Sequence, residues 1–152
     1  MSSLTIRKAT KDDLDLLMAS RKEALKAMFG EIPEADLDYM MAHTLEYYKN
    51  NVDHVTYFVF DGDTFAACGS ICFYQVMPSL HNPTGNKAYI INMYTHHDYR
   101  RRGLSNQLLD RLVQEAKERN IKEVHLDATS MGKPVYAKYG FIPSESEMHL
   151  PI

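Results

Sequence analysis

Cysteine is scarce in this chain of 152 residues, which contains only Cys68 and Cys72. The two lie four positions apart in a segment of strand character, and such positions on one strand are about 13 Å apart, beyond the reach of a disulfide. This excludes a disulfide-stabilised scaffold. It favours two small core residues in a reducing compartment.

The chain also lacks an excess of positive charge and any long apolar run. Lysine and arginine total 17 against 20 acidic residues, a formal net charge of −3. This argues against broad nucleic-acid binding, because that mode neutralises many phosphates. No window approaches the ~20 apolar residues of a membrane-spanning helix, and the first residues lack the basic and apolar regions of a secretory signal. We therefore expect a cytoplasmic protein that binds neither nucleic acid nor membrane.

No internal repeat, low-complexity tract or interdomain linker is found in the sequence. A chain of this length can form one hydrophobic core without a metal or a disulfide. The sequence therefore predicts a single domain over residues 1–152.

The first thirty residues predict a strand followed by a helix. Residues 4–8 alternate apolar and polar as a short strand does, and Thr10 with Asp13 matches a capping box. Apolar residues then recur at helical spacing over 14–28, and the same stripe includes Arg21. Gly30 is expected to end this helix.

A second helix and a hairpin follow. Pro33 suits the first turn of a helix that continues to about Tyr48. Segments 54–60 and 64–76 are rich in β-branched and aromatic residues, and the Asp-Gly dipeptide at 61–62 between them is a strong hairpin signal. Two prolines place residues 77–86 in a surface loop.

The C-terminal half predicts a parallel strand, helix and strand unit. Residues 87–95 lack clean alternation, as strands buried on both faces do. A helix beginning at Leu104 leads to a strand over 122–127, which makes a right-handed crossover. A short helix over 134–139 and a last strand over 147–150 complete a mixed α/β fold.

The helix that begins at Leu104 is amphipathic. Leu108 and Leu112 continue its apolar face, and Arg111 and Glu115 are spaced to pair on its exposed side.

The most informative stretch is the basic loop at 100–105, Arg-Arg-Arg-Gly-Leu-Ser, which joins the predicted strand to this helix. The first turn of a helix carries backbone N–H groups without partners and a partial positive charge, and a phosphate satisfies both. Gly103 lets the backbone approach such a ligand closely. The sequence thus predicts a turn that binds a phosphate or pyrophosphate.

Two motifs in this order resemble those of the GNAT superfamily of acetyl-CoA-dependent N-acetyltransferases. The family signature Arg/Gln-x-x-Gly-x-Gly/Ala falls on Arg100, Gly103 and Ser105, where serine replaces the usual glycine or alanine. Residues 135–141, Val-Tyr-Ala-Lys-Tyr-Gly-Phe, are similar to the family's Leu-Tyr-x-x-x-Gly-Phe. The order of predicted elements is also similar to the family fold, a central mixed sheet flanked by helices.

The resemblance implies acetyl-CoA as co-substrate and no metal. Backbone groups of Met93, Tyr94 and Thr95 would bind the pantetheine arm, and one of their N–H groups would face the acetyl carbonyl. The phosphate site would be formed by the loop and the helix start, that is Arg100, Arg101, Arg102, Gly103, Leu104, Ser105 and Asn106. For the side chains of Arg100 and Arg101, a solvated basic surface is the alternative.

One coenzyme contact departs from the family pattern. Thr129, Ser130 and Gly132 stand where many relatives carry an asparagine that contacts the coenzyme. The two hydroxyls would have to replace it.

The resemblance also implies a general acid. Tyr136 stands at the position of the family tyrosine that reprotonates the departing thiolate, and a thiol of pKa about 8.5 and a phenol of about 10 are close enough for that transfer. Tyr139, one turn later, is expected to pack.

The general base remains open. Some family members use a glutamate near the start of the buried strand, acting through water, and Tyr89 stands there in this chain. Either Tyr89 or another group orders the water, or the acceptor arrives neutral. The alternatives are His96, His97, Asp98 and His125. We reject a metal cluster at 96–98, because three adjacent residues do not easily converge on one ion.

The function implied is direct transfer of an acetyl group from acetyl-CoA to an amine, without a covalent intermediate. Two alternatives stay open: transfer of another acyl group, and a non-catalytic acyl-CoA-binding regulatory module on the same fold. The sequence does not identify the acceptor amine or the oligomeric state, although the strand ends and the 77–86 loop would suit a homodimer.

Overall fold

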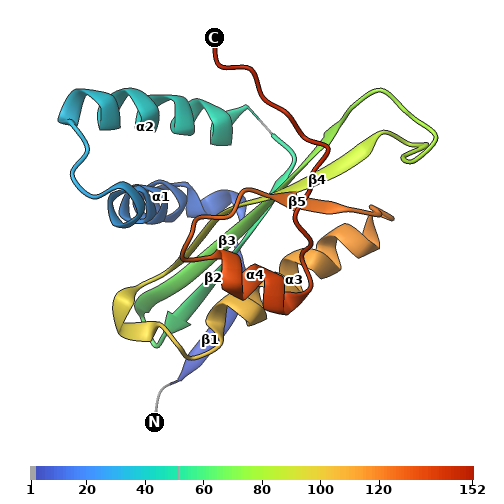
Figure 1. Cartoon of the computed structure of the whole chain (residues 1–152). Coiled ribbons are helices and arrows are strands. Elements are labelled where there is room, and N and C mark those ends of the chain that lie inside the picture. Colours follow the sequence, from blue (N-terminus) through green and yellow to red (C-terminus); the bar gives the residue numbers. More distant parts are fainter. Residues whose placement is uncertain (1–2, 51) are drawn as a thin grey trace.

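The computed structural model describes residues 3–50 and 52–152. Within these residues one five-stranded sheet, in the order β1-β2-β3-β4-β5, is flanked by four α-helices (Figure 1). We expected the first residues of the chain to lack the features of a secretory signal, and residues 1 and 2 of that segment lie outside the described part. Over the described part, none of the helices is long and apolar enough to cross a membrane.

The strands and helices follow the predicted order. The strands are β1 (Leu4–Lys8), β2 (His54–Asp61), β3 (Thr64–Gln75), β4 (Asn86–Thr95) and β5 (Val124–Leu126). The helices are α1 (Leu14–Phe29), α2 (Glu34–Lys49), α3 (Leu104–Glu118) and α4 (Lys133–Tyr139). The first three strand pairs are antiparallel and β4 pairs with β5 in parallel, so the sheet is mixed as expected.

The core on one face of the sheet is built on α3. The apolar residues of this helix recur at helical spacing and are buried: Leu104, Leu108, Leu109, Leu112 and Ala116. They pack against alternate strand residues that include Val55, Val59, Ile71 and Ile90. Because successive side chains of a strand point to opposite faces, these positions share the face that α3 covers.

The opposite face of the sheet is covered by α1 and α2. Leu17 of α1 packs with Phe58 and Cys68, which belong to the other alternating set. Cys68 is thus a core residue, and both cysteines are free thiols, as predicted. Figure 1 shows the resulting layers, with α1 and α2 on one side of the sheet and α3 and α4 on the other.

The predicted capping box stands between β1 and α1. The N–H of Thr10 donates to Asp13 Oδ2 at 2.7 Å, and Thr10 Oγ1 accepts the N–H of Asp12 at 3.3 Å. Arg7 binds the same Asp13 carboxylate through two hydrogen bonds of 2.8 and 2.9 Å. These bonds, Arg7 first and then the Thr10 N–H, lower the pKa of Asp13 to about 2. The network fixes how the chain enters α1.

The predicted parallel crossover is present, but β4 and β5 pair only briefly. Residues 88–90 lie opposite residues 124–126, and no other β4–β5 pair exists in residues 3–50 and 52–152. Asn92 then takes a φ of 61°, a left-handed conformation that asparagine tolerates better than most residues. The β3–β4 register shifts at the same level, between Cys68 and Ser70. The carboxyl ends of the two parallel strands therefore separate.

Two expectations about buried faces are wrong. β4 is not buried on both faces, because Ile91 is 42% exposed where the space between the sheet and α1 and α2 stays open. Glu115 does not pair with Arg111 at the surface. Its carboxylate is buried, where it accepts the Tyr57 hydroxyl at 2.7 Å and lies 2.5 Å from Lys8 Nζ, because the sheet offers it both a donor and a cation.

The strand predicted over 147–150 does not form. Met148 and Leu150 are 92% and 81% exposed, so their alternation finds no neighbouring strand to pack against. Pro151 follows directly and has no N–H to donate to a sheet. β5 is also shorter than the predicted 122–127, because pairing stops where β4 diverges.

Candidate functional site

A turn of unpartnered backbone N–H groups precedes α3. Arg101 and Gly103 have φ angles of 64° and 76°, which turn the chain sharply into Leu104. α3 begins without a side-chain cap and without an acidic residue in its first turn. In the described part of the chain, the N–H groups of residues 101–106 have no hydrogen-bond acceptor outside the helix. Donors arranged in this way at a helix N-terminus attract an anion.

The three arginine side chains of this loop differ in their contacts. Arg100 Nε donates to the carbonyl oxygen of Thr95 at 3.2 Å, which ties the loop to the last residue of β4. The Arg102 guanidinium lies 5.0 Å from the centroid of the Tyr99 ring. All three side chains are exposed. Arg100 and Arg102 therefore shape the loop as well as carrying charge.

The carboxyl end of β4 is anchored from both faces of the sheet. Met93 packs against the core on the α3 side, where Gly69 leaves room for it: a Cβ on Gly69 would lie 2.5 Å from Met93 Sδ. Tyr94 points the other way, and its hydroxyl donates to Glu23 Oε1 of α1 at 3.0 Å. Anchored by these side chains, the strand presents the backbone edge that β5 leaves unpaired.

Tyr136 on α4 is a half-buried phenol whose hydroxyl makes no hydrogen bond to the described residues. Its ring packs edge-on against Phe141, with 5.8 Å between centroids. A Cβ on Gly132 would lie 2.9 Å from Tyr136 Cε2, so glycine permits the ring to lie there. Burial raises the pKa of Tyr136, which keeps the phenol protonated at neutral pH.

Tyr139 has a different environment, one turn along the same helix. Its hydroxyl donates to Asp110 Oδ1 of α3 at 2.8 Å, and its ring packs on the α3-side core. The prediction that Tyr139 packs is confirmed.

Tyr89 and Asp127 meet where β4 and β5 separate. The Tyr89 hydroxyl donates to Asp127 Oδ2 at 2.5 Å. Burial, and then the bond to this carboxylate, raise the pKa of Tyr89 to about 12. Tyr89 is therefore a poor proton acceptor at neutral pH. The Asp127 carboxylate, which accepts this hydrogen bond, is the member of the pair with free lone pairs to accept a further proton.

A cavity of about 340 Å³ lies beside this region, between α1, α2, β3 and β4. Arg21 of α1, Tyr47 and Tyr48 of α2, and Ile91 and Asn92 of β4 are among the residues that line it. It opens onto the strand immediately before Met93. The cavity is thus a candidate site for a second ligand next to the free β4 edge.

Comparison with known proteins places these features in a family. Residues 20–141 match the model of the acetyltransferase (GNAT) family. The chain belongs to the GNAT acetyltransferase family. No curated protein matches it.

Solved structures agree with this GNAT assignment. A predicted acetyltransferase from Clostridium acetobutylicum, determined with acetyl-CoA, is 37% identical with a TM-score of 0.85, covering 98% of this chain and 96% of that one. A GCN5-related N-acetyltransferase from Ralstonia eutropha is 26% identical with a TM-score of 0.82, covering 99% of both chains. Glucosamine-6-phosphate N-acetyltransferase from Arabidopsis thaliana, at 20% identity and a TM-score of 0.68 over 98% of each chain, shows the same fold.

The region where many GNAT proteins carry a coenzyme-binding asparagine forms the start of α4 here. Thr129 Oγ1 accepts the N–H of Gly132 at 3.1 Å, and the Thr129 carbonyl accepts the N–H of Lys133 at 2.9 Å. The Thr129 hydroxyl oxygen therefore already accepts a hydrogen bond at the start of α4.

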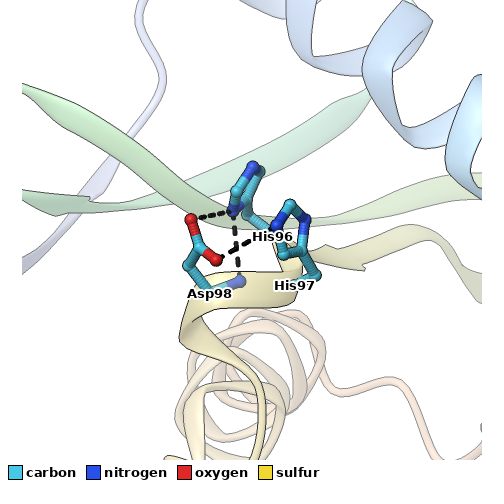
Figure 2. A group of neighbouring side chains, drawn as sticks. All are labelled: His96, His97 and Asp98. Carbon is cyan, nitrogen blue, oxygen red and sulfur yellow. Dashed lines mark hydrogen bonds and ion pairs between the residues drawn. The ribbon is translucent and has the colours of Figure 1, made fainter.

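The prediction that the side chains of residues 96–98 do not converge is wrong. Figure 2 shows the three side chains gathered on the turn after β4, and their ligand atoms lie within 4.8 Å of one another. The single turn of 3-10 helix at His97–Tyr99 brings adjacent residues together. His96 Nδ1 already accepts the N–H of Asp98 at 3.3 Å, and the side chains of His97 and Asp98 are 71% and 67% exposed. The cluster thus has the contacts of a hydrogen-bonded surface turn.

Sequence reasoning missed Arg21, Asn92 and Asp127 as candidate site residues of this GNAT chain. Arg21 carried a signal, because it is the one charged residue in an otherwise apolar helical stripe over 14–28. Asp127 carried a weaker signal as the last residue of the predicted strand, at the carboxyl end beside Tyr89. Asn92 carried none, because its left-handed backbone becomes evident only with the strand register.

Proposed function

We propose that this chain is an N-acetyltransferase that passes the acetyl group of acetyl-CoA directly to an amine acceptor, with residues 1–152 acting as one domain. The observation that carries the proposal is the row of unpartnered N–H groups at residues 101–106, which continues from the unpaired edge of β4. A phosphate-bearing ligand with an extended amide arm suits both surfaces. The Clostridium acetobutylicum relative, determined with acetyl-CoA, supports the choice of ligand.

In this proposal the loop and α3 bind the pyrophosphate. The N–H groups of residues 101–106 donate to its oxygens, and the Arg101 side chain adds a positive charge. Met93, Tyr94 and Thr95 hold the pantetheine arm along the free edge of β4 as an added strand would be held. One of their N–H groups faces the thioester oxygen, where negative charge develops as the amine attacks.

Two side chains, Asp127 and Tyr136, then transfer the protons. The amine nitrogen bonds to the thioester carbon, and the carbon–sulfur bond breaks. Of the two protons that an ammonium acceptor loses, Asp127 accepts one through water and passes it to solvent. Tyr136 protonates the departing thiolate and regains the other. Tyr89 orients the Asp127 carboxylate through the bond of 2.5 Å.

Replacing Gly103 by valine tests the phosphate turn. Gly103 has a φ of 76° and a Cβ there would meet nothing within 4 Å, so Gly103→Val places its methyl groups in the space assigned to the pyrophosphate. We expect the Kd for acetyl-CoA, measured by calorimetry, to rise at least about tenfold, the effect of losing one charge-assisted hydrogen bond.

The matched control for this variant is Gly30→Val. Gly30 ends α1 with a φ of 68° and equally open surroundings. Its ψ of −130° makes a valine at least as strained there as at Gly103, but the strain lies away from the turn. Gly30→Val should lose stability and retain the wild-type Kd. An unchanged Kd in Gly103→Val would overturn the assignment of the loop.

Removing one hydroxyl tests the general acid. We expect Tyr136→Phe to lower kcat about 100-fold with acetyl-CoA affinity unchanged, because only the proton donor is lost. The control is Tyr139→Phe, which loses the bond to Asp110 and about 1 kcal/mol of stability but keeps its turnover. Thiol release with a mixture of amines measures both variants, and equal kcat for wild type and Tyr136→Phe would assign Tyr136 to packing alone.

A pH profile tests Asp127. Asp127→Asn keeps the shape and a hydrogen-bond partner for Tyr89 but cannot accept a proton. We expect a large loss of kcat at pH 7 that shrinks as the pH approaches the pKa of the acceptor amine, because a neutral amine needs no base. A loss of the same size at every pH would contradict this role and indicate a structural one.

The same assay separates an enzyme from a binding module. Coenzyme binding without thiol release on any amine would favour a non-catalytic acyl-CoA-binding module and contradict the proposed activity.

A further inference from the structure

Arg21 lies on the face of α1 that covers the sheet, and its positive charge has no negative partner. Its Nη1 donates to Asn92 Oδ1 at 3.0 Å, and within residues 3–50 and 52–152 it forms no ion pair with an aspartate or glutamate. Burial lowers the pKa of Arg21, and the other influences on it come from Tyr48 and Cys68. A guanidinium withdrawn from water without a counter-charge is unfavourable unless an anion joins it.

The cavity that Arg21 lines is mostly apolar and aromatic, with His43, Thr44 and Ser70 among its few polar lining residues. Tyr47 and Tyr48 stand beside His54 with ring centroids 5.8 and 5.2 Å away, and Met40 and Ile91 line the same space. At about 340 Å³ it is at the lower end of the range for small-molecule pockets. No aspartate or glutamate is among its lining residues in the described part of the chain, so it is unsuited to a polyamine or another polycation.

The position of Arg21 limits where the reactive amine lies. Its partner Asn92 directly precedes Met93, the first residue assigned to the thioester arm. A ligand carboxylate bound at Arg21 therefore lies close to β4, because only the Asn92 side chain separates the guanidinium from the strand. In an α-amino acid the nitrogen is two bonds from the carboxylate carbon, which keeps the amine near β4 while the side chain extends into the cavity. An amine at the far end of a long chain would lie deep among the tyrosines instead.

We propose that the acceptor is an α-amino acid with an apolar or aromatic side chain, held by a salt bridge between its carboxylate and Arg21. This inference rests on the proposed acetyl transfer and names its substrate class. Arg21 supplies a fork that binds a carboxylate through two hydrogen bonds, and Asn92 holds the guanidinium in place. The walls formed by α2 and β4 select the side chain.

The test compares three amines in thiol-release kinetics: L-phenylalanine, phenethylamine, which lacks only the carboxylate, and spermidine. We expect wild type to prefer L-phenylalanine over phenethylamine by about 10-fold to 100-fold in kcat/KM, the range for a hydrogen-bonded charge. Spermidine should be the poorest acceptor. Calorimetry of L-phenylalanine binding in the presence of coenzyme A reports the same site without turnover.

Two variants assign the preference to Arg21. Arg21→Met keeps the length and packing of the side chain and should abolish the preference, mainly by raising the KM for L-phenylalanine. Asn92→Asp, which is nearly isosteric, gives Arg21 an internal carboxylate. We expect it to raise the melting temperature while weakening L-phenylalanine binding, because the two carboxylates compete. Arg111→Met, on the exposed side of α3, is the control and should keep the wild-type preference.

The outcomes separate this inference from the proposed function. Acetylation of phenethylamine or spermidine as fast as L-phenylalanine, or no L-phenylalanine binding in calorimetry, would overturn the amino-acid assignment and leave acetyl transfer standing. An unchanged preference in Arg21→Met would overturn the role of Arg21. Failure of acetyl-CoA to bind, with no thiol release on any amine, would refute the proposed function itself.

Discussion

The separation of β4 from β5 after three residue pairs is the constraint on which the site depends. A parallel pair that continued would satisfy the backbone of residues 93–95 and leave no edge for a ligand. The left-handed turn at Asn92 and the register shift opposite Cys68 and Ser70 accompany this separation. Helices cover both sides of the sheet, and α1 borders the opening, because its Arg21 and Glu23 bind Asn92 and Tyr94 of β4.

Three groups of the site are placed by this one opening. Tyr89 and Asp127 stand at its narrow end, joined across the last paired residues. Asn92 stands where β4 turns, and its side-chain oxygen accepts a hydrogen bond from Arg21 of α1. The loop that follows Thr95 is tied back to the strand by Arg100, so the N-terminus of α3 is held in a fixed relation to the free edge.

Much of the fold was predictable because its signals are local. The Thr10–Asp13 capping box, the hairpin at residues 61–62 and the apolar stripe of α3 each depend on residues within one or two turns of chain. The turn before α3 was predictable for the same reason, because its glycine and the helix start that follows it are adjacent in sequence; its binding of a phosphate stays a prediction.

The remaining features depend on contacts between distant segments. Tyr89 and Asp127 are 38 residues apart, and only the parallel register brings them together. The alternation at residues 147–150 resembled a strand, but a strand needs a neighbour, and none is present in the described chain. The convergence of His96, His97 and Asp98 depends on one 3-10 turn that their spacing alone did not indicate.

We propose that the backbone N–H groups at the start of α3 are the donors that bind the coenzyme. This role can be measured by amide hydrogen exchange with and without saturating acetyl-CoA. Residues 101–106 should exchange rapidly in the free protein, because they lack internal acceptors, and become strongly protected when acetyl-CoA is added. Rapid exchange at these amides while the coenzyme is bound would show that they do not hold it.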